Sequence, residues 1–189
     1  ALEIDGVEVA STDLEVLGDP SSEAGGQGIE RQMAVLRPLH AGVASVAEMI
    51  NDLETLRARL AELRTRVAES VGDSASEQLL EAIEEVAGSA EALEGRFFDL
   101  RLIGARQDSL RWNRMLYSRL TSLAWAIGRT DFTPTDSQLE VCRLMEAELR
   151  DAEERFERLR DESLPALDHQ LREAGVGLVA LAPPVETGG

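Results

Sequence analysis

The residue types that perform covalent or acid–base catalysis are sparse in this chain, and none has a suitable neighbour. The only cysteine is Cys142, and the two histidines are His40 and His169. A catalytic nucleophile needs an adjacent base, and a zinc ion needs several Cys or His ligands at short spacing. We therefore predict a non-enzymatic protein with no catalytic residue, no cofactor and no metal site. Cys142 falls on an apolar helical stripe and is expected to be a small core residue.

The chemistry of recognition, by contrast, is concentrated in one segment. Residues 95–132 contain seven of the nineteen arginines and six of the seven aromatic residues. With three aspartates and no glutamate, this segment has a net charge of +4 (7 − 3), whereas the whole chain carries −17, which leaves −21 on the other residues. Arg, Tyr and Trp are enriched in the hot spots of protein interfaces. We expect a partner to bind there.

Composition excludes several classes of function. The acidity of the chain argues against nucleic acid as a partner, because that binding requires a basic surface that neutralises phosphates. No uninterrupted run of about 18 apolar residues is present, so we predict no transmembrane segment. The chain has no lysine, and all of its cations are arginines that bind carboxylates through a planar fork. Because the chain begins at Ala1 without an initiator methionine, we expect a processed form or a fragment.

Apolar residues recur at helical spacing through most of the chain, which predicts four helices. Thr133-Pro134-Thr135-Asp136 is a typical start for the last of them, with a threonine cap, a proline at the first helical position and an acid in the first turn. Pro38 is expected to kink the first helix or to start its regular part, and Pro165 to kink the last helix near its end, which Gly175 and Gly177 terminate. The predicted helices cover about residues 29–71, 76–103, 108–128 and 134–174.

The short connections at residues 72–75, 104–107 and 129–132 predict that consecutive helices are antiparallel neighbours. The fold class is therefore mainly α, an antiparallel up-down helical bundle. Its long first and last helices should extend beyond the middle pair as a coiled-coil-like arm.

The first residues follow a different pattern, in which apolar and acidic residues alternate around Asp5-Gly6. This alternation and the Asp-Gly turn predict a small N-terminal β-ribbon, which needs a further surface to be stable. A Ser- and Gly-rich stretch follows the ribbon. We predict a β-ribbon at 1–19, a flexible linker at 20–28, the helical bundle at 29–177 and an extended tail at 178–189.

A helical projection of residues 108–128, at about 100° per residue, separates the basic and aromatic segment into two faces. The core stripe is predicted to contain Trp112, Leu116, Leu120, Leu123 and Ile127. The opposite face is predicted to bind a partner through Arg111, Arg114, Tyr117, Thr121, Trp125 and Arg129.

Three interpretations of this second face remain open at the level of sequence. The acidic first or last helix could fold over it, so that Arg111 and Arg114 pair internally and Trp125 closes the core. An external protein could bind it. Anionic lipid head groups could also bind it, because Arg with Trp and Tyr suits a membrane surface and salt screens the repulsion from the acidic remainder.

Several stretches of the sequence also resemble a known family. The quoted stretches are Asp108 to Arg111, Leu116 to Leu123, Asp131 to Val141 and Leu164 to Val176, and the turn Asp131-Phe132-Thr133-Pro134-Thr135 is the best single marker. They resemble the C-terminal helical region of bacterial sortilin-like proteins with BNR/Asp-box β-propellers, in which a strand pair, an Asp-Pro step and a long helix follow the propeller. The resemblance covers most of the chain.

The resemblance has limited functional content, because the chain has no Ser-x-Asp-x-Gly-x-x-Trp box and therefore no propeller repeat. It implies an extracytoplasmic protein, periplasmic or secreted. We expect a scaffolding or accessory subunit of a larger assembly, such as a membrane complex to which it is peripheral, with residues 2–16 as a second contact. The alternatives are the helical C-terminal module of a secreted propeller hydrolase or receptor-like protein, and a protein that docks on anionic lipid.

Overall fold

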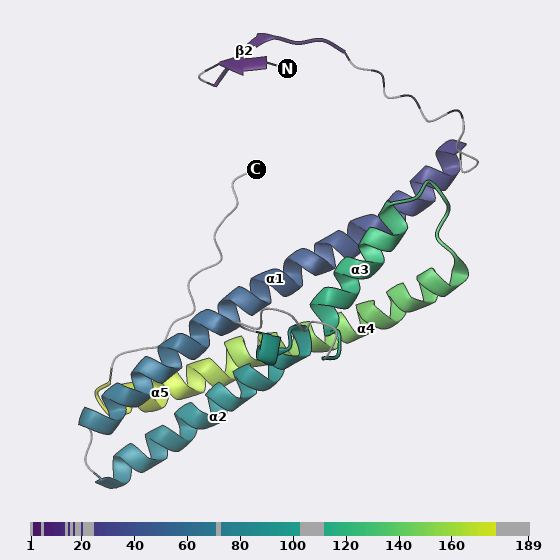
Figure 1. The fold of residues 1–189 in the computed structure, drawn as a ribbon. Helices are drawn as coiled ribbons and strands as arrows, with labels where there is room; N and C mark the ends of the chain where they lie inside the picture. The colour runs from purple at the N-terminus through teal and green to yellow at the C-terminus, as the bar shows by residue number, and fades with distance from the viewer. Residues whose placement is uncertain are drawn as a thin grey trace.

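The computed structural model describes residues 2–4, 6–13, 15, 17, 20, 25–70, 73–102 and 112–176. The fold is mainly α, with a long first helix and a long last helix that pack together, as predicted (Figure 1). The elements are α1 (Gly25–Ser70), α2 (Asp73–Phe97), the short 3-10 turn η1 (Leu100–Leu102), α3 (Leu116–Gly128), α4 (Asp136–Arg158), the π-helical turn η2 (Leu159–Ser163) and α5 (Leu164–Glu173).

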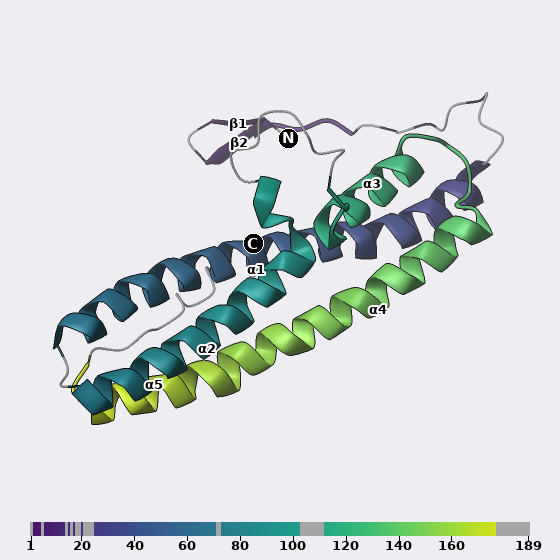
Figure 2. The same cartoon turned by 60° about the horizontal axis from the view of Figure 1, so that its bottom comes forward.

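The helices form three columns, which differs from the predicted order. The α1–α2 ion pairs Arg57–Glu94 and Arg64–Glu84 show that α2 runs antiparallel to the second half of α1. The α3 helix runs in the same direction as α2 and lies along the first half of α1 (Figures 1 and 2). The prediction that the second and third helices are antiparallel neighbours is therefore wrong. The third column, α4 to α5, runs parallel to α1.

The lengths of the helices explain this arrangement. At about 1.5 Å per residue, α1 is about 69 Å long, whereas α2 is about 38 Å and α3 about 20 Å. Had the chain reversed after α2, the apolar stripe in the first half of α1 would lack a cover. By continuing in the same direction, α3 packs against that stripe and buries Leu36 and Leu39.

The core follows the predicted apolar stripes of the helices. Burying one such side chain fully contributes about 1.5–3 kcal/mol. The largest fully buried apolar side chains of the core are Leu53, Leu56, Leu60, Leu63, Ile83, Phe97, Leu116, Leu120, Ile127, Leu167 and Leu171.

The first helix begins earlier than predicted. It starts at Gly25, inside the segment predicted to be a flexible linker (20–28), and continues through Pro38. Near this end, the side-chain amide of the buried Gln32 donates to the carbonyl oxygen of Ile127 at 2.7 Å and also to that of Thr130. These bonds attach the beginning of α1 to the end of α3.

The last helix ends as predicted but begins at Asp136, so Pro134 is not its first residue. Thr135 caps α4, and its side chain and that of Gln138 form a reciprocal capping box. The π-helical turn η2 lies directly before Pro165, where the proline has no N–H to donate. Gly175, at φ 73°, ends α5, and the next amide, of Val176, donates back to the Leu171 carbonyl at 2.8 Å.

At the N-terminus, β1 (Leu2–Ile4) and β2 (Val7–Ala10) pair antiparallel, with Ile4 opposite Val7 and the turn at Gly6. Both views set the two strands apart from the helices, on the side of α1 and α3 opposite α4 (Figures 1 and 2). The predicted tail at 178–189 lies outside the described residues.

By length and composition alone, α1 contains a stretch that is apolar enough to cross a membrane, with a mean hydropathy of 1.2. The prediction of no transmembrane segment considered only runs of apolar residues, and this stretch also contains charged residues. Within this apolar stretch, 28% is buried inside the protein.

Candidate functional site

The candidate site is built around α3, which is shorter than predicted. The helix begins at Leu116 rather than near residue 108. Leu116, Leu120 and Ile127 are buried as predicted, and Leu123 is partly buried. Trp112 was predicted to share this stripe, but it lies before the helix and is half-buried.

Trp112 is held by a different interaction. The guanidinium of Arg101 lies 3.8 Å from the centre of its ring. Arg101 also donates to both carboxylate oxygens of Asp99, at 2.8 and 2.6 Å. This bidentate bond lowers the pKa of the Asp99 carboxyl. The stacked series Asp99–Arg101–Trp112 therefore joins the end of α2 to the residues that precede α3.

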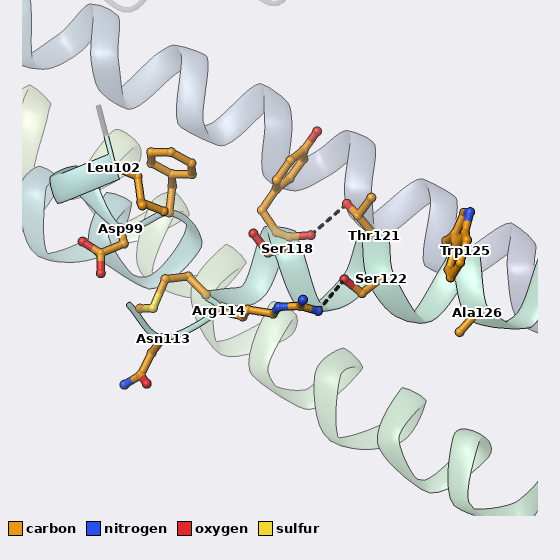
Figure 3. A pocket seen from close by; sticks show the side chains of 12 residues that line it. Asp99, Leu102, Asn113, Arg114, Ser118, Thr121, Ser122, Trp125 and Ala126 are labelled. Atoms are coloured by element: carbon orange, nitrogen blue, oxygen red, sulfur yellow. Dashed lines mark hydrogen bonds between the residues drawn. The ribbon is translucent and has the colours of Figure 1, made fainter. Parts of the chain in front are cut away.

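Four of the predicted partner-binding residues lie together along a groove of about 750 Å³. Arg114, Tyr117, Thr121 and Trp125 all line it (Figure 3). Phe98, Asp99 and Leu102, after the end of α2, also line the groove. The lining thus combines aromatic and aliphatic side chains with one carboxylate, Asp99, which Arg101 already neutralises.

Arg114 is exposed at the edge of the groove. Its guanidinium donates to the Ser122 hydroxyl at 3.3 Å, and within the described residues it forms no ion pair. The Thr121 hydroxyl donates to the Tyr117 carbonyl at 2.9 Å, which fixes its rotamer along the helix. Arg114 is therefore available to a carboxylate from outside.

Trp125 is 64% exposed, although it is one of the largest apolar side chains in the protein. The guanidinium of Arg129 lies 4.6 Å from the centre of its ring. Beyond Trp125, a second hollow of about 450 Å³ is lined by Trp125, Arg129 and Phe132, the last of which is 65% exposed. Trp125 lines both hollows and therefore lies where the two meet.

We call Arg114, Tyr117, Thr121, Trp125 and Arg129 the α3 outer face. Tyr117 is partly buried against the core, whereas Trp125 and both arginines are exposed, so neither α1 nor α4 covers that part of the face among the described residues. The predicted alternative of an internal acidic cover is thus not found in that part of the chain. Acids of α2 and α4 pair elsewhere, for example Glu148 with Arg119. Arg111, also predicted here, lies outside the described residues.

Sequence reasoning missed the groove residues Phe98, Asp99 and Leu102 and the exposed Phe132. Apolar periodicity continued the second helix to residue 103, which hid the end of the helix at Phe97. The available signal was the pair of adjacent aromatic residues Phe97-Phe98 followed by Asp99, because two neighbouring residues cannot both lie on one apolar stripe of a helix.

The remaining reactive side chains do not form a second site. Cys142 is buried, and burial raises the pKa of its thiol. His169 is exposed and lies 3.6 Å from the carboxylate of Glu173. Within the described ranges, no group of three His, Cys, Asp or Glu side chains could hold a metal ion.

No known family model, curated protein or solved structure matches this chain. The resemblance to sortilin-like proteins therefore depends on the quoted motifs alone.

Proposed function

We propose that this protein is a non-enzymatic protein–protein interaction module that binds its partner through the α3 outer face. The observation that carries the proposal is Trp125, which is 64% exposed beside Arg129 on a concave surface. A single exposed tryptophan is an ordinary feature. A tryptophan between two hollows, with arginines that lack an acidic partner among the described residues, is typical of an interface hot spot.

Energetics favour a protein over other ligands for this face. An arginine at the edge of a groove forms a bidentate bond with a carboxylate, and a partner that covers the groove would strengthen that bond by excluding water. A bilayer surface cannot fill a concave groove, and the net charge of −17 repels anionic lipid. A protein segment with its own side chains fits both requirements.

The proposal includes the setting that the resemblance implies. We propose an extracytoplasmic scaffolding or accessory subunit, peripheral to a larger assembly such as a membrane complex. Anionic-lipid docking remains the second candidate, favoured by the apolar stretch of α1 together with the exposed Trp125 and Phe132. It predicts sedimentation with anionic vesicles that falls as salt rises.

The test is affinity capture from the membrane and soluble fractions of the source cells with the immobilised full chain. The variant Arg114→Glu/Trp125→Ala changes only exposed side chains and should leave the helical circular dichroism unchanged. We expect it to lose the captured partner. The matched control Arg158→Glu/His169→Ala reverses one exposed arginine and truncates one exposed ring on the last helix, and it should retain the partner.

If the folded face variant captures the same proteins as the natural chain, the α3 outer face is not the interface. If it sediments with anionic vesicles less than the natural chain does while capture is unchanged, the face binds lipid instead.

A further inference from the structure

The N-terminal segment, residues 1–24, is complementary to the α3 outer face. It supplies negative charge and aliphatic side chains, whereas the face is basic and aromatic. Residues 1–24 contain seven acidic side chains and no basic one. The same residues contain seven large aliphatic side chains, among them Val7 and Val9. The segment is thus acidic and apolar, which is the complement of a basic and aromatic face.

The strand pair of this segment lacks a cover. Val7 and Val9 lie on the same face of β2, because side chains alternate along a strand, and they are 63% and 52% exposed. A two-stranded hairpin is at best marginally stable in water unless a further surface covers its apolar side. Among the described residues, no helix buries these two valines.

The tether places the two surfaces within reach of each other. The bonds from Gln32 to Ile127 and Thr130 hold the beginning of α1 beside the end of α3. Fourteen residues, 11–24, separate β2 from Gly25 and can span at most about 50 Å. Since α3 is only about 20 Å long, the hairpin can reach any part of the α3 outer face.

From these observations we infer that the β1–β2 hairpin docks on the α3 outer face of its own chain and covers the partner-binding site reversibly. Val7 and Val9 pack on the ring of Trp125. The exposed Asp13 and Glu15, which follow β2, lie near Arg114 and Arg129. A connection of only fourteen residues gives an effective concentration on the order of mM, so the same chain is favoured over a second copy at micromolar protein. The function of the cover depends on the proposed function, because an external partner must displace the hairpin.

The inference is tested by contact quenching of a bimane dye by tryptophan. The dye is attached to the full chain at Thr12→Cys, an exposed position beyond β2. Cys142 does not compete for the label, because it is buried and burial raises its thiol pKa. The natural chain treated with the same reagent measures any residual labelling.

The proposed docking predicts that Trp125→Phe raises the dye emission by about two-fold or more, which corresponds to a hairpin that is docked at least half of the time. The matched control Trp112→Phe should leave the emission unchanged. Arg114→Glu/Arg129→Glu should relieve quenching although Trp125 remains, whereas Arg64→Glu/Arg158→Glu, with the same change in net charge, should not.

Equal emission in the natural sequence and in Trp125→Phe would overturn the inference. Quenching that disappears on ten-fold dilution would also overturn it and would assign the contact to a second copy. Neither result affects the capture experiment, in which dependence on Trp125 can persist without any docking of the hairpin. The two proposals can therefore fail independently.

Discussion

The α2 and α3 helices occupy equivalent positions along α1, yet their outward surfaces are opposite in character. The α2 helix contains seven acids and one arginine, whereas α3 contains one arginine and no acid. Around α2 and α5, the large apolar side chains described are buried or partly buried. Around α3 and the beginnings of α1 and α4, six remain exposed: Ile29, Met33, Trp125, Phe132, Val141 and Leu144.

This difference separates two tasks within one bundle. The closed half, formed by α2, α5 and the second half of α1, buries its large apolar side chains. The open half, formed by α3 and the beginnings of α1 and α4, contributes to the same core but also keeps apolar and cationic groups accessible. Under the proposed function, the exposed apolar groups of the open half belong to an interaction surface, because scattered exposed groups are ordinary but clustered ones are not.

The largest loss of unfolding free energy is expected for Leu60→Ala in the closed half. Leu60 is 1% exposed, and truncation of such a leucine costs about 2–5 kcal/mol because of the lost transfer energy and the cavity. Leu144→Ala, at a leucine that is 65% exposed, should cost less than about 0.5 kcal/mol. Urea denaturation of both variants measures the free energies of unfolding, and similar losses would contradict the assignment of the two surfaces.

A smaller effect is expected from the two ion pairs between α1 and α2. The Glu94 side chain is 1% exposed and bonds to Arg57, which is 36% exposed. Because water still reaches Arg57, we expect Glu94→Ala to cost about 1–3 kcal/mol, below the range for a fully buried pair. In Glu84→Ala the exposed pair with Arg64 is lost, at an expected cost of less than about 0.5 kcal/mol. Equal decreases in melting temperature for the two variants would show that the burial of Glu94 does not determine how much stability is lost.

The third prediction concerns pH at the junction between the two halves. The Asp99 pKa is lowered by the bond from Arg101, so this bond stabilises the fold above the ordinary carboxyl value of 3.8 and is lost as the pH falls through the lower, folded-state pKa. In a Trp125→Phe chain, the emission of Trp112 should change in that range. Asp99→Asn should give the acid emission already at pH 7.

Bonds from Arg96 and Arg155 also lower the pKa of Asp151, so the helices lose stability in the same acid range. Circular dichroism separates the two events, because Asp99→Asn should keep its helical signal at pH 7. Identical Trp112 emission in Asp99→Asn and its parent at pH 7 would refute the role of the Asp99–Arg101–Trp112 series.

The smallest effect on stability is expected from Trp125→Ala. A side chain that is 64% exposed should contribute less than about 0.5 kcal/mol, although tryptophan is usually a costly residue to remove. A loss of several kcal/mol in thermal or urea unfolding would mean that Trp125 supports the fold and that its exposure is not reserved for a partner.

Much of this fold was predictable from the sequence. Apolar periodicity located both long helices and their buried residues, the Thr-Pro-Thr-Asp signal located the start of the last helix to within two residues, and Gly175 marked its end. These signals are local, because one helix face or one cap is encoded within a few turns. The direction of α3 was not predictable in this way, since it depends on which part of α1 remains uncovered by α2.

The candidate site was predicted in part for the same reason. The spacing of Tyr117, Thr121 and Trp125 encodes a helix face, and the structure gathers these three along one groove with Arg114, which precedes the helix. Trp112 was assigned to the wrong environment, because periodicity cannot detect that the helix begins only at Leu116 or that Arg101 stacks on the ring. Contacts between segments distant in sequence leave no periodic trace.

The most direct test of the central claim is the affinity of the captured partner for three forms of the full chain, measured by titration. The natural chain and Arg158→Glu/His169→Ala should bind with affinities that agree within about three-fold, since rim or remote charges contribute little. Arg114→Glu/Trp125→Ala should bind about 100-fold more weakly or worse, because each hot-spot residue contributes about 1.4 kcal/mol or more. Undiminished affinity of the folded face variant would contradict the proposal that α3 presents the interface.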